Sequence, residues 1–353
     1  VASCSPLTGT AGDCSVGGAF ATQLKKAGLD GIVLTGRAAR WTGLEVADAA
    51  AALVDAGTLA GLPTHEAHAL LAGRGATAVI GPAAEAGCLF ANVMFDRNHA
   101  AGRNGLGAVW AAKRLKYVTV RGAGKVPVAD PGGLAKARED IFRLVAAAPI
   151  LLGECGIANY GTAALYDLMH ARRMMPTDNF RRTVFDAAAA VNAPAMARKY
   201  QPHKAGCRGC HILCKRGTAD GRHLPEFETL SHFSALLGND DLATVVAAND
   251  LCGEMGMDTI TAGATLACHA EIIGRRLAPE EVLSLLADIG RGRGLGRELG
   301  QGSARYAASR GRPELSMSVK GQELPAYDPR GAYGMALSYA VSTRGADHLV
   351  ADR

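Results

Sequence analysis

The sequence changes pattern at Lys125–Gly133, which reads KVPVADPGG. Its closely spaced prolines and glycines interrupt helical and strand patterns and are typical of a linker. Before it, residues 1–125 mix glycine-rich turns with short apolar runs, whereas apolar residues recur at helical spacing after it. This division predicts an α+β chain in which a β-rich part precedes a mostly helical part.

The first part is expected to form a mainly β or α+β unit. Leu115–Val120 (LKYVTV) is a candidate strand because it is rich in β-forming residues, and Gly31–Leu34 is another. Ala21–Ala27 is a candidate short helix, because Gly28 follows it as a stop signal.

The second part is expected to consist of helices separated by short turns. The candidate helices are Leu134–Ala147, Thr162–Arg172, Val184–Val191, Ala193–Tyr200, Asp241–Met255, Thr259–Ile273 and Pro279–Ile289. Thr259–Ile273 is almost entirely apolar or small, which predicts a buried helix. Tyr327–Arg330 (YDPR) predicts a turn that holds an Asp–Arg pair.

Composition narrows the classes of function. With 353 residues, 48% of them hydrophobic, the chain can bury a large core in two or more domains. The net charge is +5, and no run of Lys and Arg is interleaved with aromatics, which argues against nucleic-acid binding. No apolar stretch reaches the roughly 18 residues that a bilayer span needs, and no secretory signal is visible. We therefore expect a cytoplasmic protein without a membrane span.

The strongest chemical signal is the loop Cys207-Arg-Gly-Cys210-His-Ile-Leu-Cys214. Thiols separated by two and then three residues can point at one compact centre, which suits an iron–sulfur cluster whose fourth ligand comes from elsewhere. The same loop suits a structural zinc site completed by a histidine. The candidate histidines are His203, His211 and His223. Spacing alone leaves both interpretations open, with unliganded thiols as a third.

Six segments, taken together, resemble the aldehyde ferredoxin oxidoreductase family. They are CSPLTGTAGDCSVGG (Cys4–Gly18), the pair GPAAEAGCLFANVMFD (Gly81–Asp96) and HAAGRNGLGAVWAAK (His99–Lys113), the cysteine loop, PEFETL (Pro225–Leu230) with Gly238–Asp240, NDLCGEMGMDTITAG (Asn249–Gly263), and LPAYDPRGAYG (Leu324–Gly334) with STRGADHL (Ser342–Leu349). Each segment alone is weak, but their order and spacing match the family over nearly the whole chain. The resemblance favours a 4Fe–4S cluster in the cysteine loop.

The resemblance also implies an architecture. In this family an N-terminal β domain forms a base under a bis-pterin tungsten or molybdenum cofactor, and two mostly helical domains cover it. Residues 1–125 would be a partial β-rich pterin-binding domain, residues 126–323 the helical domain with the cysteine loop, and residues 324–353 the start of a truncated C-terminal helical domain. The cluster would pass electrons to ferredoxin or an iron–sulfur subunit, and the protein would be a homo-oligomer.

The resemblance assigns the pterin phosphates, with a bridging magnesium ion, to two segments. One contains Ala100, Ala101, Gly102 and Arg103, at the start of the turn GRNGLG, whose backbone N–H groups can face phosphate oxygens. The other supplies Ser15 and Gly17, although the family usually has Asn at the position of Ser15. Taken alone, GRNGLG is equally a tight turn before a strand.

Asp258 matches a family aspartate that hydrogen-bonds the pterin ring, whose edge offers adjacent N–H donors. An N-cap for the helix that starts at Thr259 is the structural alternative, and one residue can serve both purposes. The second aspartate of this family motif is Gly253 here.

Glu228 and His348 match the family's residues near the metal, and we expect them to be catalytic. A carboxylate there can activate water or take a proton, and a neutral imidazole can hydrogen-bond the substrate. Solvated or packing roles are the alternatives for a single Glu or His, and Glu226 replaces Glu228 if the alignment slips. We expect structural or surface roles for His65, His68, His170, His232 and His269.

The implied activity is oxidation of aldehydes to carboxylic acids. Two other functions remain open: a tungsten subunit of a benzoyl-CoA-type reductase, and an inactive truncated paralogue with a structural zinc site. The chain lacks an initiating Met and the family's Asp-x-x-Gly-Leu-Cys motif, which follows RGADHL and carries the fourth cluster ligand. We expect a central portion of a longer protein, in which the missing part covers the apolar face of a helix at Met335–Val341.

Overall fold

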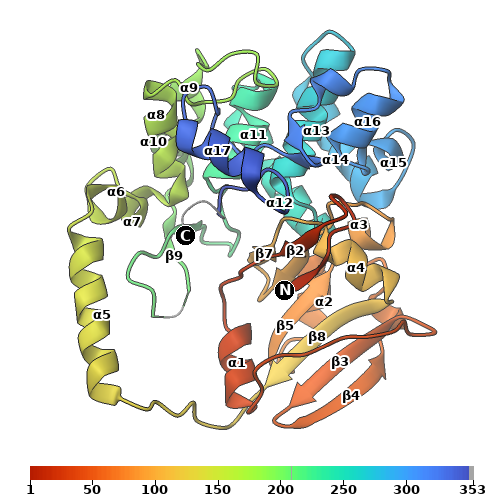
Figure 1. The fold of residues 1–353 in the computed structure, drawn as a ribbon, viewed down its shortest axis with the longest axis vertical. Coiled ribbons are helices and arrows are strands. Elements are labelled where there is room, and N and C mark those ends of the chain that lie inside the picture. The colour runs from red at the N-terminus through yellow and green to blue at the C-terminus, as the bar shows by residue number, and fades with distance from the viewer. Residues whose placement is uncertain (208, 350–353) are drawn as a thin grey trace.

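The computed structural model describes residues 1–207 and 209–349. Figure 1 shows a sheet built by the first part of the chain and a group of helices packed over one end of it. The sheet has six strands in the order β4-β3-β8-β5-β6-β7. Its strands are β3 (Thr42–Ala47), β4 (Ala50–Asp55), β5 (Ala76–Ile80), β6 (Val93–Phe95), β7 (His99–Ala101) and β8 (Leu115–Arg121). β3 and β8 run parallel, and the other neighbouring pairs are antiparallel.

The central strands β5 and β8 are buried because both faces of the sheet are covered. Alternate side chains along a strand point to opposite faces. Ala78 and Val118 accordingly join the main core, whereas Val79 and Tyr117 join a second, smaller cluster. The covering helices of this part are α1 (Phe20–Lys26), α2 (Thr64–Leu70), α3 (Pro82–Glu85) and α4 (Leu106–Ala112).

Two of the three predictions for this part are confirmed. Leu115–Val120 lies in β8, and the helix expected at Ala21–Ala27 is α1. The strand expected at Gly31–Leu34 is wrong, because this segment pairs with no strand in the described ranges. Ile32 packs against the main core while Val33 is 89% exposed, so the apolar run covers the core with side chains instead of extending the sheet.

No regular structure forms between β8 and α5 (Pro131–Ala146), which matches the linker expected at Lys125–Gly133 over most of its length. Figure 1 shows α5 standing apart from the sheet, and none of its residues is buried. The longer helices that follow are α8 (Leu165–Ala171), α10 (Ala193–Tyr200), α11 (Phe227–Phe233), α12 (Leu242–Met255), α13 (Thr259–Ile272), α14 (Pro279–Arg291), α16 (Ser303–Ser309) and α17 (Tyr333–Val341). Three short hairpins add β1 (Ala2–Cys4) with β2 (Ala11–Asp13), β9 (His203–Ala205) with β10 (Lys215–Gly217), and β11 (Ser318–Val319) with β12 (Gln322–Glu323).

The α+β class predicted from the sequence is confirmed, and so are most of the predicted helices. Residues 260–269 of α13 are all buried, as its apolar composition predicts. The helix expected at Val184–Val191 is shorter than predicted, because only α9 (Ala188–Val191) is helical. Phe185, which precedes it, lies buried in the core outside any helix. The Arg330 guanidinium lies 2.6 Å from the Asp328 carboxylate, so the predicted pair is also confirmed.

α17 presents an apolar face to solvent. Tyr333, Leu337 and Val341 are 82%, 65% and 66% exposed, while Ser338 and Tyr339 on the other side are buried. Among the described residues, no single helix has the length and apolar character to cross a membrane. One bent pair of helical segments, α5 with Pro149–Tyr160, has the length and composition of a membrane span, and these two properties alone single it out.

Candidate active site

Glu228 and His348, the predicted catalytic residues, lie side by side. Glu228 is in the first turn of α11, and His348 follows the turn after α17. The distance from His348 Nε2 to Glu228 Oε1 is 3.8 Å. The backbone N–H of Ala326 donates to Glu228 Oε2 at 2.8 Å, whereas Oε1 is buried without a hydrogen-bond partner among the described residues. The backbone thus fixes one carboxylate oxygen and leaves the other buried, without a donor among the described residues and 3.8 Å from the imidazole.

Burial sets the protonation of this pair. It is the main cause that raises the pKa of the Glu228 carboxyl to about 7, and the Asp258 and Asp347 carboxylates act in the same direction. Burial, followed by the positive charge of Arg103, lowers the pKa of His348 to about 4. Near neutral pH the imidazole is therefore uncharged, and the carboxyl can both take up and release a proton.

His232 also lies in this group, in the structural role that the sequence predicts, because its ring is fully buried and its nitrogens face the Glu228 and Leu324 carbonyl oxygens. Its buried ring lies one helical turn after Glu228, with Nδ1 3.7 Å from Glu228 Oε2. Nδ1–H donates to the Glu228 carbonyl oxygen at 2.7 Å, and burial lowers the pKa of the ring to about 4. The i, i+4 spacing from Glu228 is the signal that places both side chains on one helix face.

Arg103 joins the β-rich part to the C-terminal segments. Its guanidinium donates from Nη1 to the Ala346 carbonyl oxygen at 3.0 Å and from Nη2 to the Glu323 carbonyl oxygen at 2.8 Å. Nε lies 3.5 Å from Asp258 Oδ2 but makes no hydrogen bond. The side chain is buried and donates to two segments far apart in the sequence, so it fixes where Ala346, and hence the nearby His348, lies.

Asp258 caps α13, as the structural alternative predicts. Its carboxylate accepts the backbone N–H groups of Ile260 at 3.0 Å and Thr261 at 3.3 Å. The same side chain forms part of a cavity wall, so the cap role leaves it able to meet a ligand.

This first cavity has a volume of about 450 Å³ and lies between the β-rich part and α11–α13. Ala100 and Gly102 line it, whereas Ala101 faces the core and Arg103 lies outside it. A Cβ added to Gly102 would meet no atom within 4 Å, so the backbone is open to the cavity at this point. The wall carries both signs of charge: the cations are Arg97, Lys215 and Arg222, and the carboxylates are Glu226, Asp250, Glu254 and Asp258. Lys215 pairs with Glu226 and Arg222 with Asp250. The open backbone at Gly102 can face the oxygens of an anionic group such as a phosphate.

Ser15 and Gly17 line a second cavity, of about 670 Å³, whose other walls are mostly apolar. A Cβ added to Gly17 would lie 2.4 Å from Cys207 Sγ and 3.1 Å from His99 Cδ2. Gly17 therefore lets the cysteine loop and the β7 hairpin approach each other closely. The structure does not bring Ser15 and Gly17 into the same cavity as Ala100 and Gly102.

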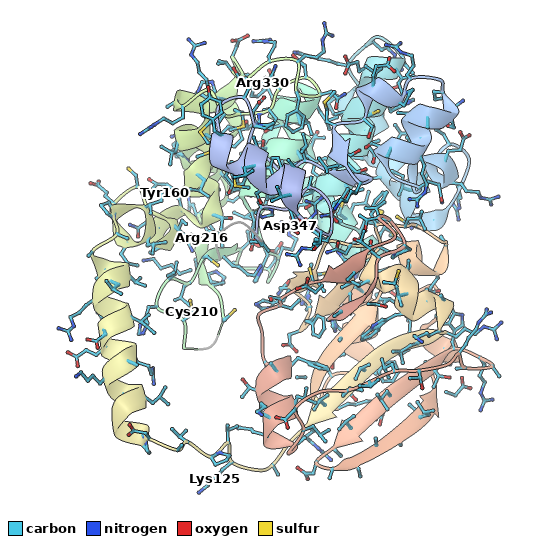
Figure 2. The ribbon with its side chains drawn as sticks, in the orientation of Figure 1. Lys125, Tyr160, Cys210, Arg216, Arg330 and Asp347 are labelled. Atoms are coloured by element: carbon cyan, nitrogen blue, oxygen red, sulfur yellow. The ribbon has the colours of Figure 1, made fainter. Side chains whose placement is uncertain are left out.

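The cysteine loop connects β9 to β10 and lies between α5 and the β-rich part, with Cys210 labelled in Figure 2. Cys207 Sγ is 3.8 Å from His99 Nε2. Burial, followed by the Glu226 carboxylate, raises the pKa of the Cys214 thiol, and Lys215 opposes this. Cys210 is exposed. Among the described residues, no three His, Cys, Asp or Glu side chains gather closely enough to hold a metal ion.

The C-terminal segment is tied to the N-terminal hairpin beside the catalytic pair. Arg344 Nη1 donates to the Asp13 carbonyl oxygen at 3.0 Å, and Arg344 Nε lies 3.0 Å from Asp347 Oδ2. Figure 2 shows Asp347 where the helical part meets the β-rich part. Sequence reasoning did not select Asp347, whose carboxylate helps to raise the pKa of Glu228, a residue distant in the sequence.

Comparison with known proteins agrees with the fold and with the predicted resemblance. The family model "Aldehyde ferredoxin oxidoreductase, N-terminal domain" matches residues 1–122, and "Aldehyde ferredoxin oxidoreductase, domains 2 & 3" matches residues 136–353. The tungsten-containing aldehyde ferredoxin oxidoreductases of Pyrococcus furiosus and Thermococcus kodakarensis are each 36% identical over 98% of this chain and 61% of theirs. The aliphatic sulfonate oxidoreductase WOR-like subunit of Pyrococcus furiosus is 26% identical over 76% of this chain and 47% of its own.

A solved structure shares the fold. It is the active-site complex BamBC of benzoyl coenzyme A reductase with 1,5-dienoyl-CoA, with a TM-score of 0.82 and 23% identity over 97% of this chain and 57% of that one. The chain spans about 61% of the length of the aldehyde ferredoxin oxidoreductases that it matches. Because family models match both the β-rich part and most of the rest, the chain belongs to the aldehyde ferredoxin oxidoreductase family.

Proposed function

We propose that this chain is part of a tungsten bis-pterin oxidoreductase that oxidises aldehydes to carboxylic acids. The observation that carries the proposal is the Glu228–His348 pair, which has buried polar atoms without protein partners. Besides Glu228 Oε1 and His348 Nδ1, the nearby atoms Arg103 Nε and Asn92 Oδ1 are buried without a hydrogen-bond partner among the described residues. Asn92 lines the first cavity, and the other three residues lie outside its wall. A buried polar atom without a partner costs about 1–3 kcal/mol, so these atoms fit a site that a polar cofactor and substrate complete.

The residues on the cavity walls fit a pterin cofactor. Asp258 would accept N–H groups of the pterin edge, because its carboxylate has lone pairs beyond those used by the helix cap. Ala100 and Gly102 would hold the phosphates and a bridging magnesium ion. Ser15 and Gly17 line the second cavity, so their proposed contact with the phosphates rests on the family resemblance and not on the cavity walls. The tungsten in the names of the relatives from Pyrococcus furiosus and Thermococcus kodakarensis supports tungsten rather than molybdenum.

Oxidation of an aldehyde with water yields an acid, two protons and two electrons. When bound, the metal centre would accept the two electrons. Glu228 would take a proton from the attacking water at Oε1, the oxygen that no protein group occupies. His348, neutral at this pH, would donate a hydrogen bond to the carbonyl oxygen as negative charge develops there. Arg103 and Ala326 would hold these groups in place.

We propose that Cys207, Cys210 and Cys214 hold a 4Fe–4S cluster that passes the electrons to ferredoxin or an iron–sulfur subunit. Thiolates are the ligands that iron–sulfur clusters use, and the loop is closed by the β9–β10 hairpin. The fourth ligand would come from outside the described residues. Nine free cysteines support a reducing compartment such as the cytoplasm. The linker supports a boundary at residue 125, and the further division of the rest into residues 126–323 and 324–353 rests on the family resemblance.

An anaerobic assay of the full-length protein tests the activity. With aldehydes and an oxidised dye, we expect one acid formed for every two electrons transferred. The same preparation with a reduced dye and an aromatic acyl-CoA should show no dye oxidation above background. Dye oxidation by the acyl-CoA without aldehyde turnover would contradict the proposal in favour of a benzoyl-CoA-type reductase.

A further inference from the structure

A continuous series of hydrogen-bonded side chains begins at Asp258, on the wall of the first cavity. Thr261 Oγ1, one turn into α13, lies 2.8 Å from Asp258 Oδ2 and 2.9 Å from Glu323 Oε2. The other oxygen of Glu323, Oε1, lies 2.9 Å from Ser303 Oγ at the start of α16. Three elements, α13, β12 and α16, thus meet through one buried carboxyl group.

The series continues from Ser303 towards the surface. Ser303 Oγ lies 2.8 Å from Ser316 Oγ, which lies 2.9 Å from Ser318 Oγ. Thr261, Glu323 and Ser303 are buried, whereas Ser316 and Ser318 are partly exposed. The hydroxyl and carboxyl groups therefore form an unbroken path from a cavity wall to solvent.

Counting the hydrogen atoms along this path shows that one of its two carboxyl groups, Asp258 or Glu323, must carry a proton. A hydroxyl has a single proton, yet two carboxyl oxygens face Thr261 Oγ1 at hydrogen-bonding distance, so one of these carboxyls must donate. Asp258 already accepts two backbone N–H groups, and Arg103 Nε lies 3.5 Å from its Oδ2, so donors surround its oxygens. Glu323 is fully buried, and this burial raises its pKa. The proton accordingly belongs to Glu323, which donates to Thr261, and Thr261 donates to Asp258.

The other ionisable groups near Glu323 do not donate to its carboxyl group in place of this proton. The Arg103 guanidinium donates to the backbone oxygen of Glu323, not to its carboxyl group. The Cys88 and Cys268 thiols are also near, and burial raises the pKa of both, so they stay uncharged. Glu323 Oε1 accepts the backbone N–H and the hydroxyl of Ser303, and these neutral donors can stabilise either protonation state.

We propose that Glu323 is a proton-relay residue that connects Asp258, on the cavity wall, with solvent at Ser316 and Ser318. This inference rests on the proposed function, because each aldehyde oxidised with water releases two protons that must leave a buried site. The electrons would leave separately, because the proposed metal centre and cluster would accept them when bound.

The relay is balanced at every link. Before a transfer, the Thr261 and serine hydroxyls rotate to point outward, and the Glu323 carboxyl turns about its Cγ–Cδ bond, which places its proton on the oxygen that faces Ser303. Asp258, after taking a proton from the site, passes it to Thr261, whose own proton moves to the unprotonated oxygen of Glu323. Glu323 releases a proton to Ser303, and the protons of Ser303, Ser316 and Ser318 each move one position outward, the last one to water. At each link one O–H bond breaks and one forms. Every group ends with its original number of protons, no electron moves, and one proton has reached solvent.

Substitutions at two threonines of α13 test the relay in the full-length holoenzyme. Thr261→Val removes the hydroxyl of the path. Thr265→Val is the matched control, because Thr265 is equally buried one turn later and its hydroxyl has no partner among the described residues. We expect Thr261→Val to lower kcat about 10-fold or more with little change in KM, and to change the solvent deuterium isotope effect on kcat. Thr261→Ser should restore both quantities, and Thr265→Val should resemble the unmodified protein.

Infrared spectroscopy gives a readout that does not need turnover. Because Glu228 is also partly protonated near neutral pH, the spectra are recorded in a Glu228→Gln background. A band from a protonated carboxyl group should be present there at neutral pH, disappear on adding Glu323→Gln and shift on adding Thr261→Val but not Thr265→Val. If aldehyde turnover is absent while this band behaves as expected, the proposed function fails and the protonated Glu323 stands. Normal kcat and isotope effects in both Thr261→Val and Glu323→Gln would overturn the relay, as would the absence of the band.

Discussion

Replacing Glu228 by Gln should lower kcat for aldehyde oxidation by about 100-fold or more. Gln keeps the shape of the side chain and can still accept the Ala326 N–H, but it cannot take a proton from water. Glu228 is not a proposed ligand of the cluster or the pterin, so metal and pterin content should stay unchanged. Steady-state kinetics of protein with matched cofactor content measures the effect.

The same variant should also change the pH profile. The pKa of Glu228 is about 7, and the proposed base is the deprotonated form. The kcat/KM of the unmodified protein should therefore rise as pH increases through about 7 and level off above it. In Glu228→Gln this limb should disappear along with most of the activity.

Glu226→Gln is the matched control for this pair of results. Glu226 is two residues away, and its carboxylate lies 2.5 Å from the Lys215 ammonium, not in the buried group around His348. We expect its turnover to stay within a few-fold of the unmodified protein. A large loss in Glu226→Gln with near-normal turnover in Glu228→Gln would move the catalytic role to Glu226.

Replacing Arg103 by Ala should cause the largest loss of stability, about 3–5 kcal/mol in the free energy of unfolding. The change leaves the Ala346 and Glu323 carbonyl oxygens without these donors and takes the nearest cation from buried Asp258. Arg103→Lys should recover only part of this loss, because one ammonium group cannot reproduce the planar set of donors. Urea unfolding measures both variants.

A surface arginine provides the comparison for Arg103. Arg310 pairs with Glu298 at 2.6 Å, but both side chains are well exposed to solvent. Arg310→Ala should change the free energy of unfolding by only about 0–1 kcal/mol. An equally small change in Arg103→Ala would mean that Arg103 does not hold the β-rich part and the C-terminal segments together.

Much of the local structure is predictable from short-range signals in the sequence. Asp258 and Asp241 occur directly before apolar helical patterns, and both cap the helices that follow. Gly31–Leu34 has the composition of a strand but no partner, because pairing depends on which chain segment lies alongside. Composition cannot supply that information.

The active site depends on contacts between distant segments. Glu228 and His348 were selected through the family resemblance, but only the fold brings them within 3.8 Å. Glu323 was missed because it precedes the matching segment at Leu324, and no local pattern separates a buried glutamate from a solvated one. The cysteine spacing predicts three thiols in one loop, yet their convergence depends on bonds to a metal, which loop propensities do not encode.

The most direct test of this account is the metal and pterin content of the full-length protein, purified without oxygen. We predict tungsten and pterin in a fixed ratio, about four iron atoms per chain, and little zinc. Cys210→Ala should lose most of the iron and keep the fold. Protein that contains stoichiometric zinc, without iron, tungsten or pterin, would contradict the account and identify the cysteine loop as a structural zinc site.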